Sequence, residues 1–330
     1  MSTVTSLAAR SDRLAFSPHV AATLRDSDLK VVVTGGGGWM GRATLEMLES
    51  AFGERTAARV RVFGSSSRVL ILRSGRPLQV HPLALLPGSV VGPHLFAHYA
   101  FATREFVAEL GLEAYVARNR AITAIAADHL ARTGPVGFFS ISSGAVYLGD
   151  DPATNPYGAL KAEDERLFLE VARQDHRGGR APRVVIPRLF NLAGPFLNKP
   201  ERYVLGSVIE DIVRGGPIQL TATKPVVRSY VHVADLVDVG FAAMTGEDPL
   251  PDTPFDTAGE REIEVGELAE LASAVLGRPG MPVERPPLDG SAPDRYVGDP
   301  TTLRSLAAAH GVPLKLLPRQ IKETALYLGL

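Results

Sequence analysis

The chain has 330 residues, of which 45% are hydrophobic and 22% charged, and its formal net charge is −1. This near-neutral balance excludes an overall basic field for nucleic acid or an anionic membrane surface, so we expect neither as a partner. Because the chain contains no cysteine, it can form no disulfide framework, thiol nucleophile or Cys-ligated zinc site.

The N-terminal stretch "MSTVTSLAARSDRLAF" lacks the continuous apolar core of a secretory signal. No stretch of the chain approaches the length of a membrane span, so we expect a cytoplasmic protein. Residues 1–29 are interpreted as a lead-in to the first domain. Within them, Ser17 is a candidate N-cap and Pro18 the first position of a short helix.

Strands and helices alternate through the first two-thirds of the chain. Short apolar runs predict strands at 30–33, 59–64, 76–80, 137–142 and 183–188. Helices are expected at 41–48, 113–132 and 156–174. This alternation predicts an α/β fold in which helices cover both faces of a parallel sheet. Past residue 190 the pattern becomes irregular, with one clear helix near 264–276, which indicates a smaller second lobe.

Four glycines in "TGGGGWMG" (34–41) stand between the first strand and a helix, where a nucleotide-binding turn would lie. Gly35 would permit the tight turn, and Gly38 would let the main chain approach a pyrophosphate. Gly41 would let the helix pack against the strand. The phosphates would then meet free amides at the helix N-terminus. The alternative is a loose turn without a ligand. Since Gly-Lys-Ser/Thr is absent, an ATP-binding P-loop is disfavoured.

A second motif, "NPYGALK" (155–161), can begin a helix with Asn155 as cap and Pro156 at its first position. The spacing of four places Tyr157 and Lys161 on one helical face. The Lys charge is expected to lower the pKa of the phenol, so that Tyr157 can exchange a proton near neutral pH. The alternative is a solvated Lys beside a half-buried Tyr.

Two further polar residues lie where this pair could use them. Ser143 ends the strand predicted at 137–142, at the sheet edge where open α/β proteins bind ligands. Its hydroxyl could hydrogen-bond a substrate oxygen, or could only cap the strand end. Asn119 lies inside an otherwise apolar and basic helix. It could orient a water behind Lys161, or bond a neighbouring backbone group.

Five motifs in this order resemble the extended short-chain dehydrogenase/reductase superfamily, and most closely its nucleotide-sugar epimerase/dehydratase branch. They are "TGGGGWMG", "SSGAVY", "YGALK", "RLFNLAGP" and "RSYVHVADL". The resemblance runs from about residue 29 to the C-terminus. It implies a Rossmann doubly wound sheet in residues 30–190, with part of 225–260, that binds the dinucleotide. It also implies a smaller α/β substrate lobe in 191–224 and 261–330, and often a homodimer.

The resemblance also implies roles for individual residues. Ser143, Tyr157 and Lys161 would form the catalytic triad, with Asn119 as its supporting fourth member. Residues expected to contact the cofactor are Gly35, Gly38, Trp39, Met40, Gly41, Tyr157 and Lys161. Residues expected to contact a nucleotide-diphosphate sugar are Ser143, Asn191, Lys199, Arg228 and Arg295. The alternative for the three cations is ordinary surface charge. His94 and His98, four apart, are interpreted as structural and not as a metal pair.

The cofactor is suggested by the end of the second strand, "VFGSSSR". NAD-binding turns place an acid there for the ribose 2′-hydroxyl, but no acid occurs from Arg55 through Arg68. Ser65 and Ser66 can donate hydrogen bonds, and Arg68 can meet a 2′-phosphate. The sequence therefore favours NADP(H), with NAD(H) as the alternative. The alternative for Arg68 is a solvent-facing loop residue without a ligand.

The reaction is narrowed by the residues that follow Ser143. Dehydratases of this branch carry an Asp-Glu pair there, whereas this chain has Gly144 and Ala145, which cannot exchange protons. We therefore predict NADP(H)-dependent reduction of a 4-keto nucleotide sugar, with 4-epimerisation as the alternative. A reductase of a non-sugar carbonyl is a third reading. A redox-sensing binding module is disfavoured, because such members lose the Tyr or the Lys.

Overall fold

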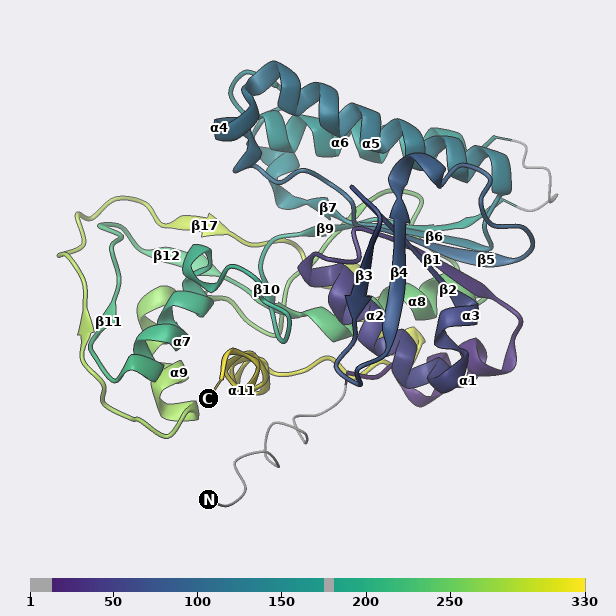
Figure 1. The fold of residues 1–330 in the computed structure, drawn as a ribbon. Helices are drawn as coiled ribbons and strands as arrows, with labels where there is room; N and C mark the ends of the chain where they lie inside the picture. Colours follow the sequence, from purple (N-terminus) through teal and green to yellow (C-terminus); the bar gives the residue numbers. More distant parts are fainter. Residues whose placement is uncertain (1–13, 175–180, 330) are drawn as a thin grey trace.

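The central sheet has seven strands and is parallel except at one edge (Figure 1). The structure is a computed structural model that describes residues 14–174 and 181–329. In spatial order the strands are β3 (Arg68–Ile71), β4 (Pro77–Pro82), β2 (Val60–Gly64), β1 (Lys30–Thr34), β5 (His94–His98), β6 (Gly137–Ser140) and β8 (Arg183–Val185). Only β3 runs antiparallel to its neighbour. This order is that of a Rossmann sheet with an added edge strand, which confirms the predicted fold class.

Helices cover both faces of this sheet (Figure 1). One face carries α1 (Pro18–Asp26), α2 (Trp39–Phe52) and α8 (Val233–Thr245), which pack on one another. The other carries α5 (Leu112–Thr133) and α6 (Pro156–Ala172), with the short α4 (Phe106–Leu110) beside them. The short α3 (Thr56–Arg59) leads into β2. Because the sheet is covered on both sides, its central strands are almost wholly buried, as their apolar runs predict.

The predicted N-terminal helix begins at Pro18, but Ser17 does not cap it. The amide and hydroxyl of Ser17 instead donate to the Asp238 carboxylate on α8, at 2.8 and 3.1 Å. Val20 and Leu24 of this helix are fully buried in the core of the main sheet. Residues from 14 onward are therefore part of the packed domain, whereas residues 1–13 lie outside the described residues.

The C-terminal third holds more helices than the predicted one. The expected helix near 264–276 is α9 (Val265–Val275). The part of the chain that the structure describes also contains α7 (Val204–Arg214), α10 (Thr301–Ala309) and α11 (Leu317–Leu328), besides α8. Helix α8 shows no apolar stripe because residues 233–244 are buried around its whole circumference. Strand β5 was also unpredicted, because histidines at both its ends hide the apolar run.

A second lobe has an apolar core of its own, built largely on α7, α9 and α11. Its strands are β12 (Val226–Arg228) between β15 (Ile263–Glu264) and β17 (Asp294–Tyr296), and the pair β11 (Ile218–Gln219) and β16 (Val283–Glu284). This core draws on segments from 193 to 230, from 263 to 283 and from 317 to 328. The domain boundaries drawn from the sequence stay a prediction.

Short strands join the two lobes at the carboxyl edge of the main sheet. The predicted strand at 137–142 divides into β6 and β7 (Ser142–Ser143), and that at 183–188 into β8 and β9 (Pro187–Leu189). Strand β9 lies between β7 and β14 (Phe255–Asp256), and β10 (Leu192–Ala193) pairs with β13 (Val231–His232). Within the described residues, no helix combines the length and apolar character that a bilayer crossing requires.

Candidate active site

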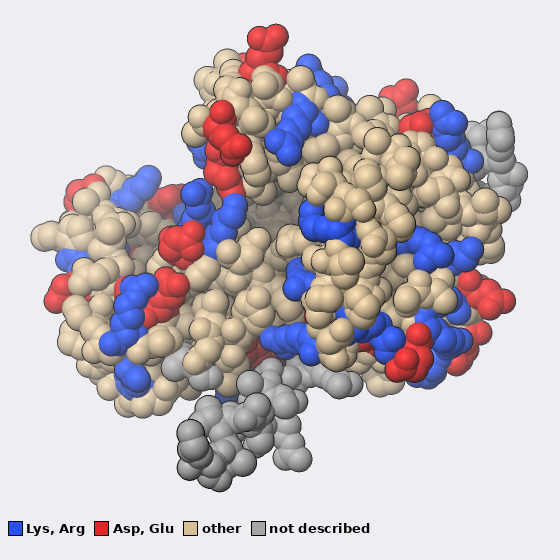
Figure 2. All heavy atoms as spheres, in the orientation of Figure 1, with Lys and Arg blue, Asp and Glu red and all other residues tan. Residues whose placement is uncertain are grey.

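A cleft of about 450 Å³ lies between the two lobes, at the carboxyl edge of the main sheet. Its walls are the glycine turn, the loop after β5, the β7 edge with the start of α6, and the segments 189–192 and 198–203. Figure 2 shows the surface hollowed between the lobes, with Lys and Arg side chains on both sides of the hollow. Ligands of open α/β sheets bind in this position.

At two positions of the glycine turn, any side chain would clash with neighbouring backbone atoms. Gly35 has a φ of +70°, and a Cβ there would lie 2.7 Å from the Tyr99 carbonyl carbon and the Ala100 nitrogen. A Cβ at Gly41 would lie 2.6 Å from the Gly36 Cα, so only glycine lets α2 pack this closely on the turn. Gly38 is the N-cap of α2, and no side chain caps this helix. The first-turn amides of α2 are thus free to bind an anion.

Trp39 and Met40 line the cleft at the start of α2, where the sequence places a cofactor contact. The Trp39 indole N–H donates to the Pro195 carbonyl at 2.7 Å, and its ring meets the Tyr203 ring edge-on with centroids 5.4 Å apart. Both contacts tie α2 to the 195–203 segment on the opposite wall. The cofactor roles of Trp39 and Met40 stay predictions.

Ser65 and Ser66 directly follow β2 and Arg68 is the first residue of β3; all three are exposed and outside the cleft wall. The Arg68 side chain extends back over the glycine turn, because its Nη2 lies 2.9 Å from the position of a Cβ at Gly37. Among the described residues no carboxylate forms an ion pair with Arg68. The guanidinium is therefore available to a ligand that lies beside the turn.

The motif at 155–161 forms the predicted helix start. The Asn155 carboxamide oxygen accepts from the Gly158 amide at 3.1 Å, and Pro156 is the first residue of α6. The Asn155 Nδ2 donates to the carbonyls of Ala145 and Gly149, at 2.8 and 2.7 Å. Asn155 thereby holds α6 against the segment that follows Ser143, and Tyr157 faces the cleft beside that serine.

The expected lowering of the Tyr157 pKa is wrong for this structure. Burial raises the pKa of Tyr157 above its ordinary value, and the hydrogen bond with Ser143 only partly offsets this. Lys161 does not contact the phenol: its ammonium donates to the Ile141 carbonyl at 3.0 Å and lies 3.8 Å from the Phe101 ring centroid. The Phe101 ring itself meets the Tyr157 ring edge-on. Burial lowers the pKa of Lys161, with the Asp164 charge opposing it.

Asn119 is fully buried, and backbone groups occupy its carboxamide. Its Oδ1 accepts from the Ala102 amide at 2.8 Å, and its Nδ2 donates to the carbonyls of Ala102 and Tyr115, both at 3.2 Å. Of the two roles that the sequence leaves open, this geometry favours the bond to neighbouring backbone. Asn119 thus fixes the loop that carries Phe101.

Of the five predicted substrate contacts, Ser143 and Lys199 line the cleft, and the side chains of Asn191, Arg228 and Arg295 are outside its wall. Lys199 pairs with Glu105 across the cleft. Arg228 pairs with Asp294 at 3.2 Å.

The remaining two residues make internal contacts. Asn191 Nδ2 donates to the Ser229 and Tyr296 carbonyls, at 3.3 and 3.2 Å. The Arg295 side chain is 54% exposed and pairs with Glu262. This structure does not support the substrate contact predicted for Arg295. Successive side chains of β17 point to opposite faces of the strand, and it is the side chain of the next residue that points toward Ser143.

That neighbour, Tyr296, is a site residue that sequence reasoning missed. Its hydroxyl lies 3.3 Å from Ser143 Oγ, and its ring packs on Phe190 with centroids 4.8 Å apart. Ser143 Oγ also accepts from the Ala145 amide at 3.1 Å. Arg202 and Tyr203 on the 198–203 wall were missed as well. The aromatic-basic pattern "ERYV" was the available signal for the last two.

A buried charge cluster supports the strand that carries Ser143. Glu165 of α6 accepts from Ser142 Oγ at 2.5 Å and from two nitrogens of Arg188, both at 2.8 Å. Arg188 also donates to the Tyr147 hydroxyl at 2.7 Å. Since Glu165 and Tyr157 share one helix, this cluster sets the position of α6 relative to β7.

His98 and His94 are buried at the two ends of β5, as the structural interpretation expects. His98 Nδ1 lies 2.8 Å from Thr34 Oγ1, and His94 Nε2 lies 3.3 Å from His129 Nε2. These contacts link β5 to β1 and to α5.

Comparison with known proteins agrees with this geometry. A family model described as the NAD dependent epimerase/dehydratase family matches residues 31–253. A curated relative, the dTDP-4-dehydro-6-deoxy-D-allose reductase of a Streptomyces species, is 33% identical over 145 residues. That alignment covers 43% of this chain and 41% of the relative.

Solved structures show the same fold over nearly the whole chain. MoeE5 in complex with UDP-glucose and NAD has a TM-score of 0.66 at 18% identity, covering 91% of this chain and 98% of that one. A UDP-N-acetylglucosamine 4-epimerase from Methanobrevibacter ruminantium M1, in complex with UDP-N-acetylmuramic acid, has a TM-score of 0.67 at 19% identity. It covers 92% of this chain and 98% of that one.

Proposed function

Because the chain belongs to the NAD dependent epimerase/dehydratase family, we propose that it reduces the 4-keto group of a nucleotide-diphosphate sugar with NADPH. The observation that carries this proposal is the convergence of Ser143 and Tyr157 on one cleft, opposite a glycine turn with free helix amides. A bound nicotinamide supplies a hydride in such a site. The protein supplies the proton, the orientation and the charges.

Tyr157 is the proposed proton donor to the keto oxygen, and Ser143 holds that oxygen by a hydrogen bond. The raised pKa of Tyr157 supports this direction, because the phenol stays protonated and can give a proton during reduction. Lys161 would bind the nicotinamide ribose. To bind the ribose, the Lys161 ammonium would have to move away from its present position over the Phe101 ring.

Dehydration is disfavoured by the space at position 144. A Cβ at Gly144 would lie 2.6 Å from two ring carbons of Phe190, so an acidic side chain does not fit there without displacing that ring. Among the described residues the cleft wall includes one carboxylate, Glu105, and it is paired with Lys199. The described part of the wall therefore offers no unpaired carboxylate that could act, beside Tyr157, as the extra acid or base for the removal of water.

The preference for NADP(H) is supported by Arg68. Its guanidinium lies over Gly37, free of ion pairs among the described residues, and a 2′-phosphate is a suitable partner for a planar fork of donors. The same position lacks the acid that would bind the 2′-hydroxyl of NAD. NAD(H) remains the alternative, and MoeE5 is a structural neighbour that binds it.

The proposed substrate is supported by the opposite wall of the cleft. Lys199 and Arg202 place cationic groups along it, as a diphosphate requires. Next to Ser143 the wall includes the Phe190 ring, and the Tyr296 ring packs on that ring; this aromatic surface suits a sugar with an apolar C6 methyl group. The name of the Streptomyces relative specifies a 4-keto-6-deoxy sugar, in agreement with such a wall.

Purified protein incubated with NADPH and dTDP-4-keto-6-deoxyglucose tests the proposal. We expect stoichiometric loss of the reduced-nicotinamide absorbance and a 4-hydroxy sugar product. Conversion of a 4-hydroxy nucleotide sugar to its C4 epimer without loss of added cofactor would instead establish the 4-epimerase. Tyr157→Phe, assayed in parallel, distinguishes catalysis in this cleft from a contaminating activity.

A further inference from the structure

A buried carboxylate lies beside Lys161, and the proposed reaction gives it no role. It belongs to Asp164 of α6, which is 6% exposed, and its Oδ2 lies 3.7 Å from the Lys161 ammonium nitrogen. Tyr157, Lys161 and Asp164 are spaced four and three residues apart, so they follow one another along one face of the helix. Because a buried ion pair often contributes little net stability, stability alone does not explain this one.

The distance within this pair leaves the ammonium free to serve a ligand. At 3.7 Å the carboxylate attracts the ammonium but does not accept a hydrogen bond from it. One N–H of Lys161 goes to the Ile141 carbonyl at 3.0 Å, and the ammonium also lies over the Phe101 ring. Since an ammonium carries three donors, the others remain available to a ligand in the cleft, whose wall includes Lys161.

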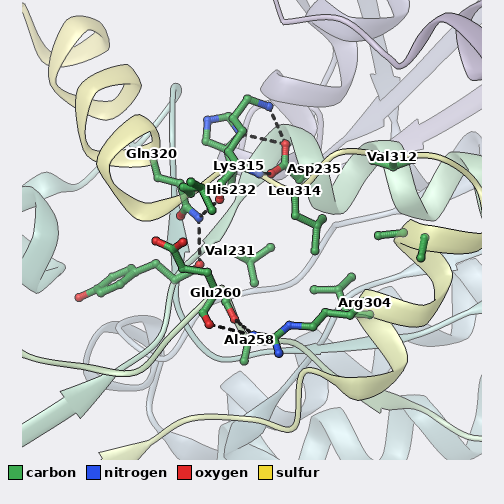
Figure 3. Close-up of a pocket in the computed structure, with 16 residues that line it drawn as sticks. Val231, His232, Asp235, Ala258, Glu260, Arg304, Val312, Leu314, Lys315 and Gln320 are labelled. Carbon is green, nitrogen blue, oxygen red and sulfur yellow. Dashed lines mark hydrogen bonds and ion pairs between the residues drawn. The ribbon is translucent and has the colours of Figure 1, made fainter.

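The lysine and aspartate drawn in Figure 3 form a different kind of pair. Lys315 and Asp235 lie in the wall of a second cavity, of about 430 Å³, which shares no lining residue with the cleft. There the Asp235 carboxylate accepts from the ammonium and from the backbone amide of Lys315, at 2.5 and 2.6 Å. Such contacts fix the lysine in place. The longer distance at Lys161 keeps a negative charge close without occupying the donors of the ammonium.

Asp164 is itself held from the neighbouring helix. Its Oδ1 accepts from Thr123 Oγ1 of α5 at 2.6 Å. Its Oδ2, the oxygen that pairs with Lys161, has no hydrogen-bond donor among the described residues. One oxygen thus anchors the side chain between α5 and α6, and the other presents its charge to the ammonium.

The other titratable groups around this pair are neutral or already paired. Burial shifts the pKa of each neutral group toward its uncharged form, and these groups are His98 of β5, Tyr115 of α5 and Tyr157. The paired group is Glu165, which accepts two hydrogen bonds from Arg188. Among the described residues, Asp164 is therefore the one carboxylate that forms an ion pair with Lys161.

We propose that Asp164 is a positioning residue of the active site, which holds the Lys161 ammonium charged at the cleft wall so that it can donate to the ribose of the bound cofactor. This role of Asp164 rests on the proposed function, which gives Lys161 its ligand. Burial lowers the pKa of Lys161, and the charge of Asp164 opposes this. Without that charge the ammonium would lose its proton at a lower pH, and a neutral amine is a weaker donor to a ribose hydroxyl.

The charge of Lys161 can be followed by NMR on protein whose lysines carry carbon-13 at Cε, titrated from about pH 6 to about pH 10.5. Lys161→Met assigns the signal. Asp164→Asn, which replaces the carboxylate by a neutral group of the same shape, should lower the titration midpoint of Lys161 by about 1–3 pH units. Asp164→Ser should lower it in the same direction, so a fold lost in one variant leaves the test standing. An unchanged midpoint overturns the proposal.

Two control variants separate the charge of Asp164 from its part in the packing of α5 and α6. Thr123→Val removes the hydroxyl that anchors Asp164 but keeps the carboxylate. Glu163→Gln removes the preceding carboxylate of α6, which pairs with the exposed Arg120. We expect both to keep the Lys161 midpoint within about 0.5 pH unit of the wild type. A shift in Thr123→Val as large as that in Asp164→Asn would mean that packing sets the midpoint, against the proposal.

The pH dependence of NADPH binding, measured by fluorescence titration, connects this charge with the cofactor. The pH above which the Kd for NADPH rises should be lower in Asp164→Asn than in the wild type, by the same amount as the NMR midpoint. If the midpoint moves while the Kd of both proteins keeps one pH dependence, the proposed link to the ribose is wrong. If the wild type binds no NADPH at any pH, the proposed function fails instead, and the NMR midpoints still decide whether Asp164 holds the charge.

Discussion

Replacing Arg68 with alanine should change the choice between NADPH and NADH. The guanidinium lies over Gly37 and is available to the 2′-phosphate, which only NADPH carries. A charge-assisted hydrogen bond of this kind contributes about 1.5–3 kcal/mol. At about 1.4 kcal/mol per tenfold, Arg68→Ala should raise the Kd for NADPH roughly 10- to 100-fold. The Kd for NADH should change by less than about threefold, because the 2′-hydroxyl makes no charged contact there.

Fluorescence titration of each reduced cofactor measures both constants on the same protein. Arg61→Ala is a suitable control, because this exposed arginine of β2 donates to the Ala57 carbonyl, away from the turn. We expect Arg61→Ala to keep the wild-type ratio of the two constants. If Arg68→Ala leaves the ratio unchanged as well, or if the wild type prefers NADH, the argument from Arg68 fails.

Three further predictions concern the catalytic edge of the sheet. Tyr157→Phe should lower kcat roughly 10²- to 10⁴-fold while the cofactor Kd stays constant, and retained turnover would disprove the assignment. Glu165→Gln should lower the free energy of unfolding by roughly 2 kcal/mol in urea titrations, because it breaks the two-bonded pair with Arg188, whose side chain is only 21% exposed. Glu163→Gln, on the same helix but in a pair with the exposed Arg120, should cost less than about 0.5 kcal/mol, and equal losses would contradict the role of the cluster. Burial, with the nearby Lys charge, lowers the pKa of His98 to about 3. His98 of the unfolded chain therefore binds a proton below about pH 6.5, whereas His98 of the folded chain binds one only below about pH 3. Between these two pH values the free energy of unfolding falls as the pH falls. Over it the wild type should lose about 1.4 kcal/mol more per pH unit than His98→Gln, and equal slopes would refute the shift.

The parts of the site that the sequence predicted are those carried by a contiguous pattern. The glycine turn needs Gly35 and Gly41 for local backbone reasons, so their spacing is visible in the sequence. The start of α6 is similar, because the cap Asn155 accepts a hydrogen bond from an amide only three residues further along the chain. Such short-range constraints can be recognised in the sequence without knowledge of the fold. The alternation of strands and helices can be recognised in the same way.

The parts that failed depend on partners far along the chain. Whether Arg295 or Tyr296 faces Ser143 is decided by the pairing of β17 with β12, which the sequence alone does not reveal. The pKa of Tyr157 was expected to fall through Lys161, but the ammonium is held by Ile141 and Phe101. Helix α8 was missed because complete burial removes the apolar stripe by which helices are found.

Deuteride transfer tests the central claim most directly. NADPH labelled with deuterium at the transferred position is mixed with dTDP-4-keto-6-deoxyglucose and the wild-type protein, and the sugar product is analysed by mass spectrometry and NMR. We predict one deuterium at C4 of the product for each cofactor oxidised. A product without deuterium at C4, or no oxidation of the labelled cofactor, would contradict the account.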